Sequence, residues 1–184
     1  MNHCQIAQFT AHKGDPLCEA IEAKTRSEFT HSTIYVGVNP LTGKHRIYEQ
    51  FDPCARFRDL TDDELAGIRL FSIQGWTDEQ DAKLRALIQS RADAKIPYWI
   101  DGLLRFSALD RMIEGEATDA DWYKHAFCSM EVFRCVLECG TRLLNAHDYE
   151  VSPAVLGYST LLLPEPNLIP FPCGSGSQTS SLAA

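Results

Sequence analysis

The sequence predicts one domain that contains both β-strands and helices, and two patterns carry this prediction. Residues 29–38 and 45–51 are rich in β-branched and aromatic side chains and flank a turn-type segment at 39–44, which is typical of an antiparallel β-hairpin. From Cys128 onwards, apolar residues recur at three- and four-residue spacing, which indicates an amphipathic helix. With 184 residues, of which 45% are hydrophobic, the chain can bury a substantial core without disulfides or metals.

Ahead of the hairpin, the sequence predicts a strand over residues 3–10 and a helix over 16–26. Asp15 is suited to cap that helix, and Pro16 is suited to its first position, where a backbone N–H has no partner within the helix. We therefore expect the order strand, helix, hairpin at the start of the chain.

After the hairpin, two short patterns mark the starts of helices. A Thr-x-x-Glu pattern at 61–64 predicts a single helical turn, and a Thr-x-x-Gln pattern at 77–80 predicts a helix that extends to about Asp93. Residues 68–73, which lie between these patterns, have the composition of a third strand.

The second half of the chain is less regular in sequence. Residues 98–113 hold many large apolar side chains and predict a short buried helix, and residues 114–121 predict an acidic loop before the amphipathic helix. Five of the nine prolines fall within 153–172, so we expect there an extended surface arm and neither a helix nor a central strand. Residues 174–184 have linker composition and predict a flexible tail, which leaves 1–173 as the single folded domain.

Charge and cysteine content restrict the environment and the partners of the protein. The net charge is −8 and no stripe of lysine and arginine is present, which argues against nucleic-acid binding. Seven cysteines without a Cys-x-x-Cys pair predict free thiols in a reducing, cytoplasmic compartment. The first residues lack a basic segment followed by an apolar run, so we expect no secretory signal, and the apolar run at 161–163 is too short to span a membrane.

Cys128 is the first candidate for a functional residue. It lies at the predicted start of a helix, where unpaired backbone N–H groups carry partial positive charge and favour thiolate over thiol. The alternative is a small buried side chain, which is the commonest state of a free cysteine. An active site needs a thiol that reagents can reach, whereas a structural role allows burial.

A histidine and a carboxylate on the hairpin complete a possible catalytic triad. His31 would accept the proton of the Cys128 thiol, and Glu49 would orient the imidazole. Residues directly opposite each other share a face of a sheet, so His31 and Glu49 can meet if paired residues have an even sum of residue numbers. An odd sum would put them on opposite faces, and the turn at 39–44 leaves the register open.

Three segments resemble a known family of cysteine hydrolases. Residues 29–37, Phe-Thr-His-Ser-Thr-Ile-Tyr-Val-Gly, are similar to the family's strand "sHvgiyvG", and residues 127–131, Phe-Cys-Ser-Met-Glu, resemble its nucleophile helix "CSElv". Residues 152–156, Ser-Pro-Ala-Val-Leu, resemble its late "tPgdL" segment, with Met130 and Val155 as departures. On these residues, the chain resembles the circularly permuted, NlpC-type branch of the papain-like cysteine hydrolases, the YiiX-like proteins.

The resemblance implies an α+β fold in which an antiparallel sheet packs against the helix that carries the nucleophilic cysteine. It implies catalytic roles for Cys128, His31 and Glu49. Lecithin retinol acyltransferase-like relatives have a second histidine where this chain has Glu49, which favours the YiiX-like branch. We expect neither a metal nor another cofactor.

The function implied by this resemblance is hydrolysis of an acyl bond by a thiolate–imidazole pair, with a peptide or amide as the favoured substrate. One alternative is a lipid acyltransferase or thioesterase of the same fold, which would act on acyl lipids. A second alternative, of a different class, is a non-enzymatic binding or structural protein in which the three residues are incidental.

Other residues compete for the catalytic roles. His125, three residues before Cys128, is a second possible base, and Asp52 is a second possible orienting group. Tyr98 or Tyr123 could donate a hydrogen bond to an oxyanion beside the thiol. We favour surface or packing roles for all four.

Cys128, Cys135 and Cys139 fall on one stripe of the predicted helix and raise the alternative of a zinc site. Cys128 and Cys139 are about 16 Å apart along a helix that rises ~1.5 Å per residue, so they cannot bind the same ion. Cys135 and Cys139 are one turn apart but have no further ligands nearby in the sequence. We therefore interpret them as core cysteines.

Overall fold

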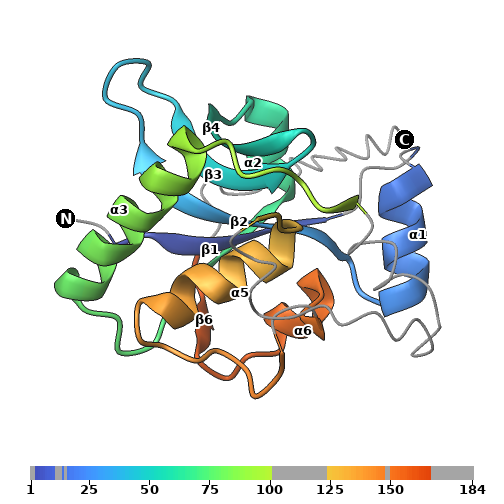
Figure 1. The fold of residues 1–184 in the computed structure, drawn as a ribbon. Coiled ribbons are helices and arrows are strands. Elements are labelled where there is room, and N and C mark those ends of the chain that lie inside the picture. The colour runs from blue at the N-terminus through green and yellow to red at the C-terminus, as the bar shows by residue number, and fades with distance from the viewer. Residues whose placement is uncertain (1–2, 11–13, 15, 101–123, 148–149, 167–184) are drawn as a thin grey trace, which may run out of the picture.

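The computed structural model describes residues 3–10, 14, 16–100, 124–147 and 150–166. These residues form an α+β structure with a six-stranded antiparallel sheet in the order β4-β3-β2-β1-β5-β6 (Figure 1). The strands are β1 (Gln5–Thr10), β2 (Phe29–Val38), β3 (His45–Phe51), β4 (Cys54–Asp59), β5 (Ile68–Ile73) and β6 (Leu162–Pro164).

The helices that position the site lie across one face of this sheet. Figure 1 shows α3 and α5 there, with α6 beside α5 and α1 at one end of the sheet. The helices of the described ranges are α1 (Pro16–Thr25), α2 (Asp62–Gly67), α3 (Asp78–Asp93), α5 (Cys128–Glu138) and α6 (Pro153–Gly157).

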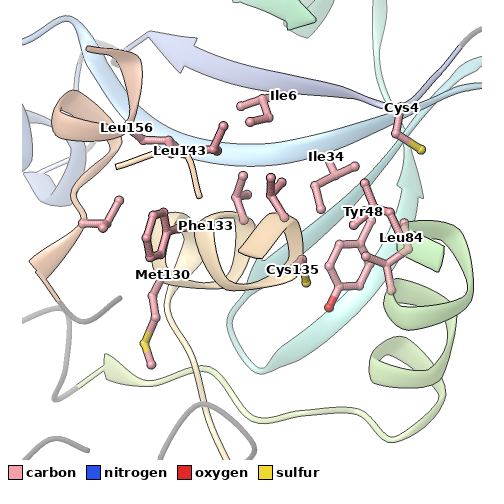
Figure 2. Packing of buried hydrophobic residues seen from close by; sticks show 14 of the residues in the cluster. Cys4, Ile6, Ile34, Tyr48, Leu84, Met130, Phe133, Cys135, Leu143 and Leu156 are labelled. Carbon is pink, nitrogen blue, oxygen red and sulfur yellow. The ribbon is translucent and has the colours of Figure 1, made fainter. Parts of the chain in front are cut away.

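The core has two parts because successive residues of a strand point to opposite faces of the sheet. On β2, Ile34 belongs to the larger cluster, which includes residues of α3 and α5, whereas Tyr35 belongs to a smaller cluster that includes Leu65 of α2. Figure 2 shows Phe133 of α5 and Leu84 of α3 in the larger cluster, together with strand residues. Full burial of one such side chain contributes roughly 1.5–3 kcal/mol, so this cluster is the main force that holds α5 on the sheet.

The hairpin and both helix-start patterns are confirmed. β2 and β3 pair in antiparallel orientation. The Thr61 hydroxyl accepts the Glu64 N–H at 3.3 Å while the Glu64 carboxylate accepts the Thr61 N–H at 2.9 Å, and Thr77 and Gln80 make the same exchange at α3. The end of α5 is marked by a glycine. The helix ends at Glu138, and Gly140 has a φ of +93°, which a glycine adopts at little cost, so the helix does not continue through it.

A buried ion pair fixes α5 against its neighbours. Arg91 of α3 donates from Nε and Nη2 to the two carboxylate oxygens of Glu131 on α5, and the Tyr48 hydroxyl of β3 donates to the same carboxylate. Glu131 is fully buried and Arg91 is 5% exposed, so each charge depends on the other for compensation. The pair therefore ties the first turn of α5 to both α3 and the sheet.

The prediction of an extended arm without a helix over 153–172 is wrong for residues 153–157, which form a helix. α6 begins at Pro153, and the Ser152 hydroxyl accepts the Val155 N–H at 2.9 Å. A proline at the first helical position lacks only an N–H that would have no partner within the helix, so it does not oppose the helix. Leu162–Pro164 forms β6, an edge strand on β5, and edge strands tolerate proline.

Several predicted elements lie wholly or mainly outside the described residues. These are the helix over 98–113, the acidic loop over 114–121 and the tail over 174–184. β4, in contrast, is present although the sequence did not suggest it. Within the described ranges, no helix combines the length and the apolar character needed to cross a bilayer.

Candidate active site

Cys128 is the first residue of α5, and its sulfur lies among hydrogen-bond donors. Phe127, at the N-cap position, provides no side-chain cap. The backbone N–H groups of Ser32 on β2 and Ser129 on α5 donate to the sulfur. Together with the partial positive charge of the helix start, these donors favour a negative charge on Cys128.

A layer of buried polar side chains anchors this end of α5 to the sheet. The Ser129 hydroxyl donates to the Val151 carbonyl at 2.6 Å. The Ser32 hydroxyl donates to Gln8 Oε1 at 2.9 Å, and Gln8 Nε2 donates to the Pro153 carbonyl at 3.3 Å. Because these side chains are fully buried and hydrogen-bonded, the layer sets the position of the thiol relative to β2.

His31, on β2, lies between Cys128 and Glu49. Its imidazole is a hydrogen-bond partner of Cys128, and its Nε2 is 3.4 Å from Glu49 Oε2. Since Nε2 is directed at Glu49, Nδ1 is the nitrogen left to face the sulfur. Phe9 and Phe51 flank the imidazole, with ring centroids 5.8 and 5.5 Å away. The structure thus brings the three candidate residues together.

A bulge in β2 decides that His31 and Glu49 can meet. Next to the turn, Gly37 pairs with Arg46, and the sum of the two residue numbers is odd. On the other side of the bulge at 35–37, Ile34 pairs with Tyr48, and the sum is even. An even sum places His31 and Glu49 on the same face. Gly37, in the bulge, has a φ of +107°, which few other residues adopt. The bulge, and not the turn, therefore aligns the two side chains.

Two arginines of β4 hold the Glu49 carboxylate, which is 1% exposed. Nε of Arg56 and Nε of Arg58 donate to Oε1 at 2.9 and 2.8 Å, which leaves Oε2 facing His31. The 3.4 Å separation from His31 Nε2 is an ion-pair distance without good hydrogen-bond geometry, so this contact is electrostatic. The sequence predictions omitted both arginines; their signal was the Arg-Phe-Arg alternation at 56–58, which indicates a strand with one charged face.

The three groups shift one another's pKa values. Burial raises the pKa of the Cys128 thiol. His31 and the backbone N–H donors lower this pKa by more than burial raises it, so the net shift is downward. Burial lowers the pKa of His31, but the Cys128 thiolate and then Glu49 raise it to about 9. Burial raises the pKa of Glu49, yet His31 and Arg58 bring it down to about 2. His31 is thus an imidazolium and Glu49 a carboxylate near neutral pH, and the pKa of the Cys128 thiol between His31 and the backbone donors lies below its ordinary value.

Cys128 is only 2% exposed, so burial alone does not distinguish it from a structural cysteine. The charged groups around its sulfur distinguish it from the other buried cysteines. Burial raises the pKa of Cys4 to about 12 and also raises the pKa values of Cys135 and Cys139. The pKa of Cys128 is lowered because His31 stands beside it.

Of the competing residues, Tyr98 borders the candidate site, whereas His125 contacts a tryptophan ring. His125 packs against Trp99, with ring centroids 4.3 Å apart at 67°. Burial and the nearby Cys128 thiolate raise the pKa of the Tyr98 phenol, so Tyr98 lies close to the sulfur and stays protonated. Tyr123 lies outside the described residues.

We expect iodoacetamide to modify Cys128 faster than the other six cysteines at neutral pH, because the thiolate is the reacting form and the pKa of Cys128 is lowered. Cys18 and Cys54 are partly exposed and serve as internal controls for access. A labelling time course analysed by peptide mass spectrometry measures the relative rates. Uniform labelling, or faster labelling of Cys135 or Cys139, would contradict a reactive Cys128.

Comparisons with known proteins find a likeness in fold. No family model and no curated protein sequence matches the chain. A solved structure, the crystal structure of metalloprotein yiiX from Escherichia coli O157:H7 (DUF1105), superposes with a TM-score of 0.65 over 92% of this chain and 98% of that chain, at 15% identity. The described residues of this chain contain no group of three or more His, Cys, Asp and Glu side chains that could hold a metal ion. The comparison establishes a YiiX-like α+β fold for this chain.

Proposed function

We propose that this protein is a cysteine-dependent hydrolase of acyl bonds, with a peptide or amide as the favoured substrate. The observation that carries the proposal is the convergence of Cys128, His31 and the buried Glu49. A thiol of lowered pKa beside a histidine of raised pKa forms a thiolate–imidazolium pair, which is the reactive form of a cysteine nucleophile. The YiiX-like fold and the three similar sequence segments support assignment to the circularly permuted, NlpC-type papain-like hydrolases.

The proposed reaction has two chemical steps. In the first, the Cys128 thiolate attacks the substrate carbonyl carbon, and the His31 imidazolium gives its proton to the leaving amine or alcohol as the carbonyl bond to it breaks. This leaves a thioester on Cys128 and a neutral imidazole. In the second, His31 takes a proton from water, the hydroxide adds to the thioester, and the carboxylic acid departs as the thiolate and imidazolium are restored.

Glu49 has the role of an orienting group in this scheme. Its carboxylate stays ionised because His31 and Arg58 lower its pKa, so it can stabilise the imidazolium without taking its proton. Attack by the thiolate places a negative charge on the carbonyl oxygen of the substrate. This oxyanion would be stabilised by the backbone N–H of Cys128, which lies in the first turn of α5, and by the hydroxyl of Tyr98.

A non-enzymatic role is the second candidate, and the low exposure of Cys128 favours it. A binding or structural protein on this fold would keep the thiol covered in solution. A lipid acyltransferase or thioesterase, in contrast, would need the same thioester and a reachable Cys128. The reactivity of Cys128 therefore distinguishes an enzyme from a binding or structural protein. The acyl group that Cys128 accepts distinguishes a peptide or amide hydrolase from a lipid acyltransferase or thioesterase.

The test uses the full-length protein and acyl-oxymethyl ketone probes that carry either a peptide or a fatty-acyl group. We expect a covalent adduct on Cys128, located by peptide mass spectrometry, that forms faster with the peptide probes. Hydrolysis of matched amide, ester and thioester substrates then defines the bond that is cleaved. The absence of any adduct on Cys128 with either probe would favour the non-enzymatic candidate, and faster reaction with the fatty-acyl probes would favour the lipid enzyme.

We expect kcat/KM to follow a bell-shaped pH dependence with an alkaline limb near pH 9. Below the lowered pKa of Cys128 the sulfur is protonated and cannot attack, and above about 9 His31 has lost the proton that the leaving group needs. Because the two groups interact, both limbs belong to the pair. Initial rates at constant ionic strength measure the profile, and an alkaline limb in the range of an ordinary histidine would contradict the raised pKa of His31.

A further inference from the structure

We propose that Arg56 and Arg58 are positioning residues for this reaction, which hold Glu49 so that one carboxylate oxygen faces His31 and which offset the charge of Glu49. The inference rests on the proposed function of the Cys128 and His31 pair. It adds two cations of β4 to a site that the sequence motifs place on β2, β3 and α5.

The geometry around Glu49 is asymmetric. In the register of β3 and β4, Glu49 lies opposite Arg56, and Arg58, two residues further, is on the same face. Both Nε atoms donate to Oε1, and a second nitrogen of Arg56 lies 2.8 Å from the same oxygen. Oε2 is therefore left for His31, and rotation of the carboxylate would break the arginine hydrogen bonds.

Arg58 is itself held from the other side. Its Nη2 lies 2.7 Å from Glu64 Oε1, and Glu64 Oε2 accepts the Thr61 N–H that closes the start of α2. The guanidinium thus bridges two carboxylates, one on the sheet and one on a helix. A side chain anchored at both ends keeps Glu49 in one orientation, which is what an orienting group requires.

The charges of this cluster cancel in the reactive state. Three groups are cationic and three are anionic when the sulfur is a thiolate and the imidazole is protonated: His31, Arg56 and Arg58 against Cys128, Glu49 and Glu64. Tyr98, with Asp52 near it, borders the cluster at the sulfur. Without the two arginines the charge of Glu49 would act on His31 and on the thiolate without compensation, which favours the uptake of protons by both groups.

The first measurement is the titration of His31 in the full-length protein, followed by NMR of the isotope-labelled imidazole. Arg56→Met and Arg58→Met, alone and combined, are expected to move this titration to higher pH. Arg46→Met is the matched control, because Arg46 lies in the same pair of strands but pairs with Asp59 at 3.8 Å, and it should leave the titration unchanged. An unchanged titration in the Arg56 and Arg58 variants would overturn the proposal.

Activity provides a second readout. Arg58→Met is expected to lower kcat/KM about tenfold, since contacting residues of one network couple at this scale, and to move both limbs of the pH profile to higher pH. Arg58→Lys keeps the positive charge but loses the planar guanidinium group with its paired N–H donors. We expect this variant to show the two limbs of the pH profile at their wild-type pH values but to recover only part of kcat/KM. A loss of rate at every pH without displaced limbs would indicate a merely structural arginine and count against the proposal.

A double-mutant cycle tests whether Arg58 acts through Glu49. In a Glu49→Gln protein the carboxylate charge is gone, so Arg58→Met should have much less effect on the His31 titration than in the wild-type background. An equal effect in both backgrounds would show that Arg58 acts on His31 without Glu49. Thermal melts confirm that each variant is folded, and the single variants carry the same test if the combined Arg56 and Arg58 variant does not fold.

The two proposals fail in different ways. If the protein is not an enzyme, Cys128 is unreactive and no substrate turns over, while the His31 titration still responds to Arg56 and Arg58. If the arginines are not positioning residues, the titration does not move although Cys128 is reactive.

Discussion

Cys128→Ala is expected to abolish turnover, with a loss in kcat of at least about 10⁴-fold, because it removes the atom that attacks the carbonyl. The fold should persist, since the exchange removes one sulfur from a helix held by Phe133, Val136 and the Glu131 ion pair. Steady-state kinetics on the substrate with the highest turnover, together with a thermal melt, measures both effects. His31→Ala should reduce turnover to a similar extent.

The matched control for this substitution is Cys135→Ala. Cys135 lies two turns further along α5 and is fully buried, but it contacts Glu131, and not the imidazole, at 3.5 Å. We expect Cys135→Ala to keep most of the activity. Retained turnover in Cys128→Ala would mean that the chemistry takes place elsewhere in the protein.

Arg91→Met is expected to lower the free energy of unfolding by about 3–5 kcal/mol. The substitution leaves the Glu131 carboxylate, which is fully buried, with the Tyr48 hydroxyl but without the guanidinium that neutralises it. Urea denaturation measures the change. The double variant Arg91→Met with Glu131→Leu removes both charges, so it should recover most of the lost stability.

Arg85→Met is the control on the same helix. Arg85 pairs with Asp81 at 2.7 Å, but the Arg85 side chain is 40% exposed. Asp81 is buried and also accepts the Cys4 N–H at 2.6 Å, so it keeps one partner after the substitution, and we expect a smaller cost than for Arg91→Met. Equal costs for Arg91→Met and Arg85→Met would show that the buried pair does not hold α5 in place.

Much of the local structure was predictable from sequence because it depends on residues close together in the chain. The hairpin follows from two β-rich segments around a turn, and the starts of α2 and α3 follow from reciprocal hydrogen bonds within four residues at Thr61 and Thr77. Cys128 at the start of α5 follows from the spacing of apolar residues after it. Proline content misled the prediction for residues 153–157, because the effect of a proline depends on its position within a helix, which composition does not show.

The sequence by itself determined the residue types of the candidate site and the elements that carry them: His31 and Glu49 on a hairpin, and Cys128 on a helix. Only the tertiary structure decided that they meet. The bulge at 35–37 changes the parity of the β2–β3 register, and a one-residue difference moves a side chain to the other face of a sheet. The contacts of Glu49 with β4 and of α5 with α3 join residues distant in the chain, so they depend on how the sheet and helices pack, which no local pattern encodes.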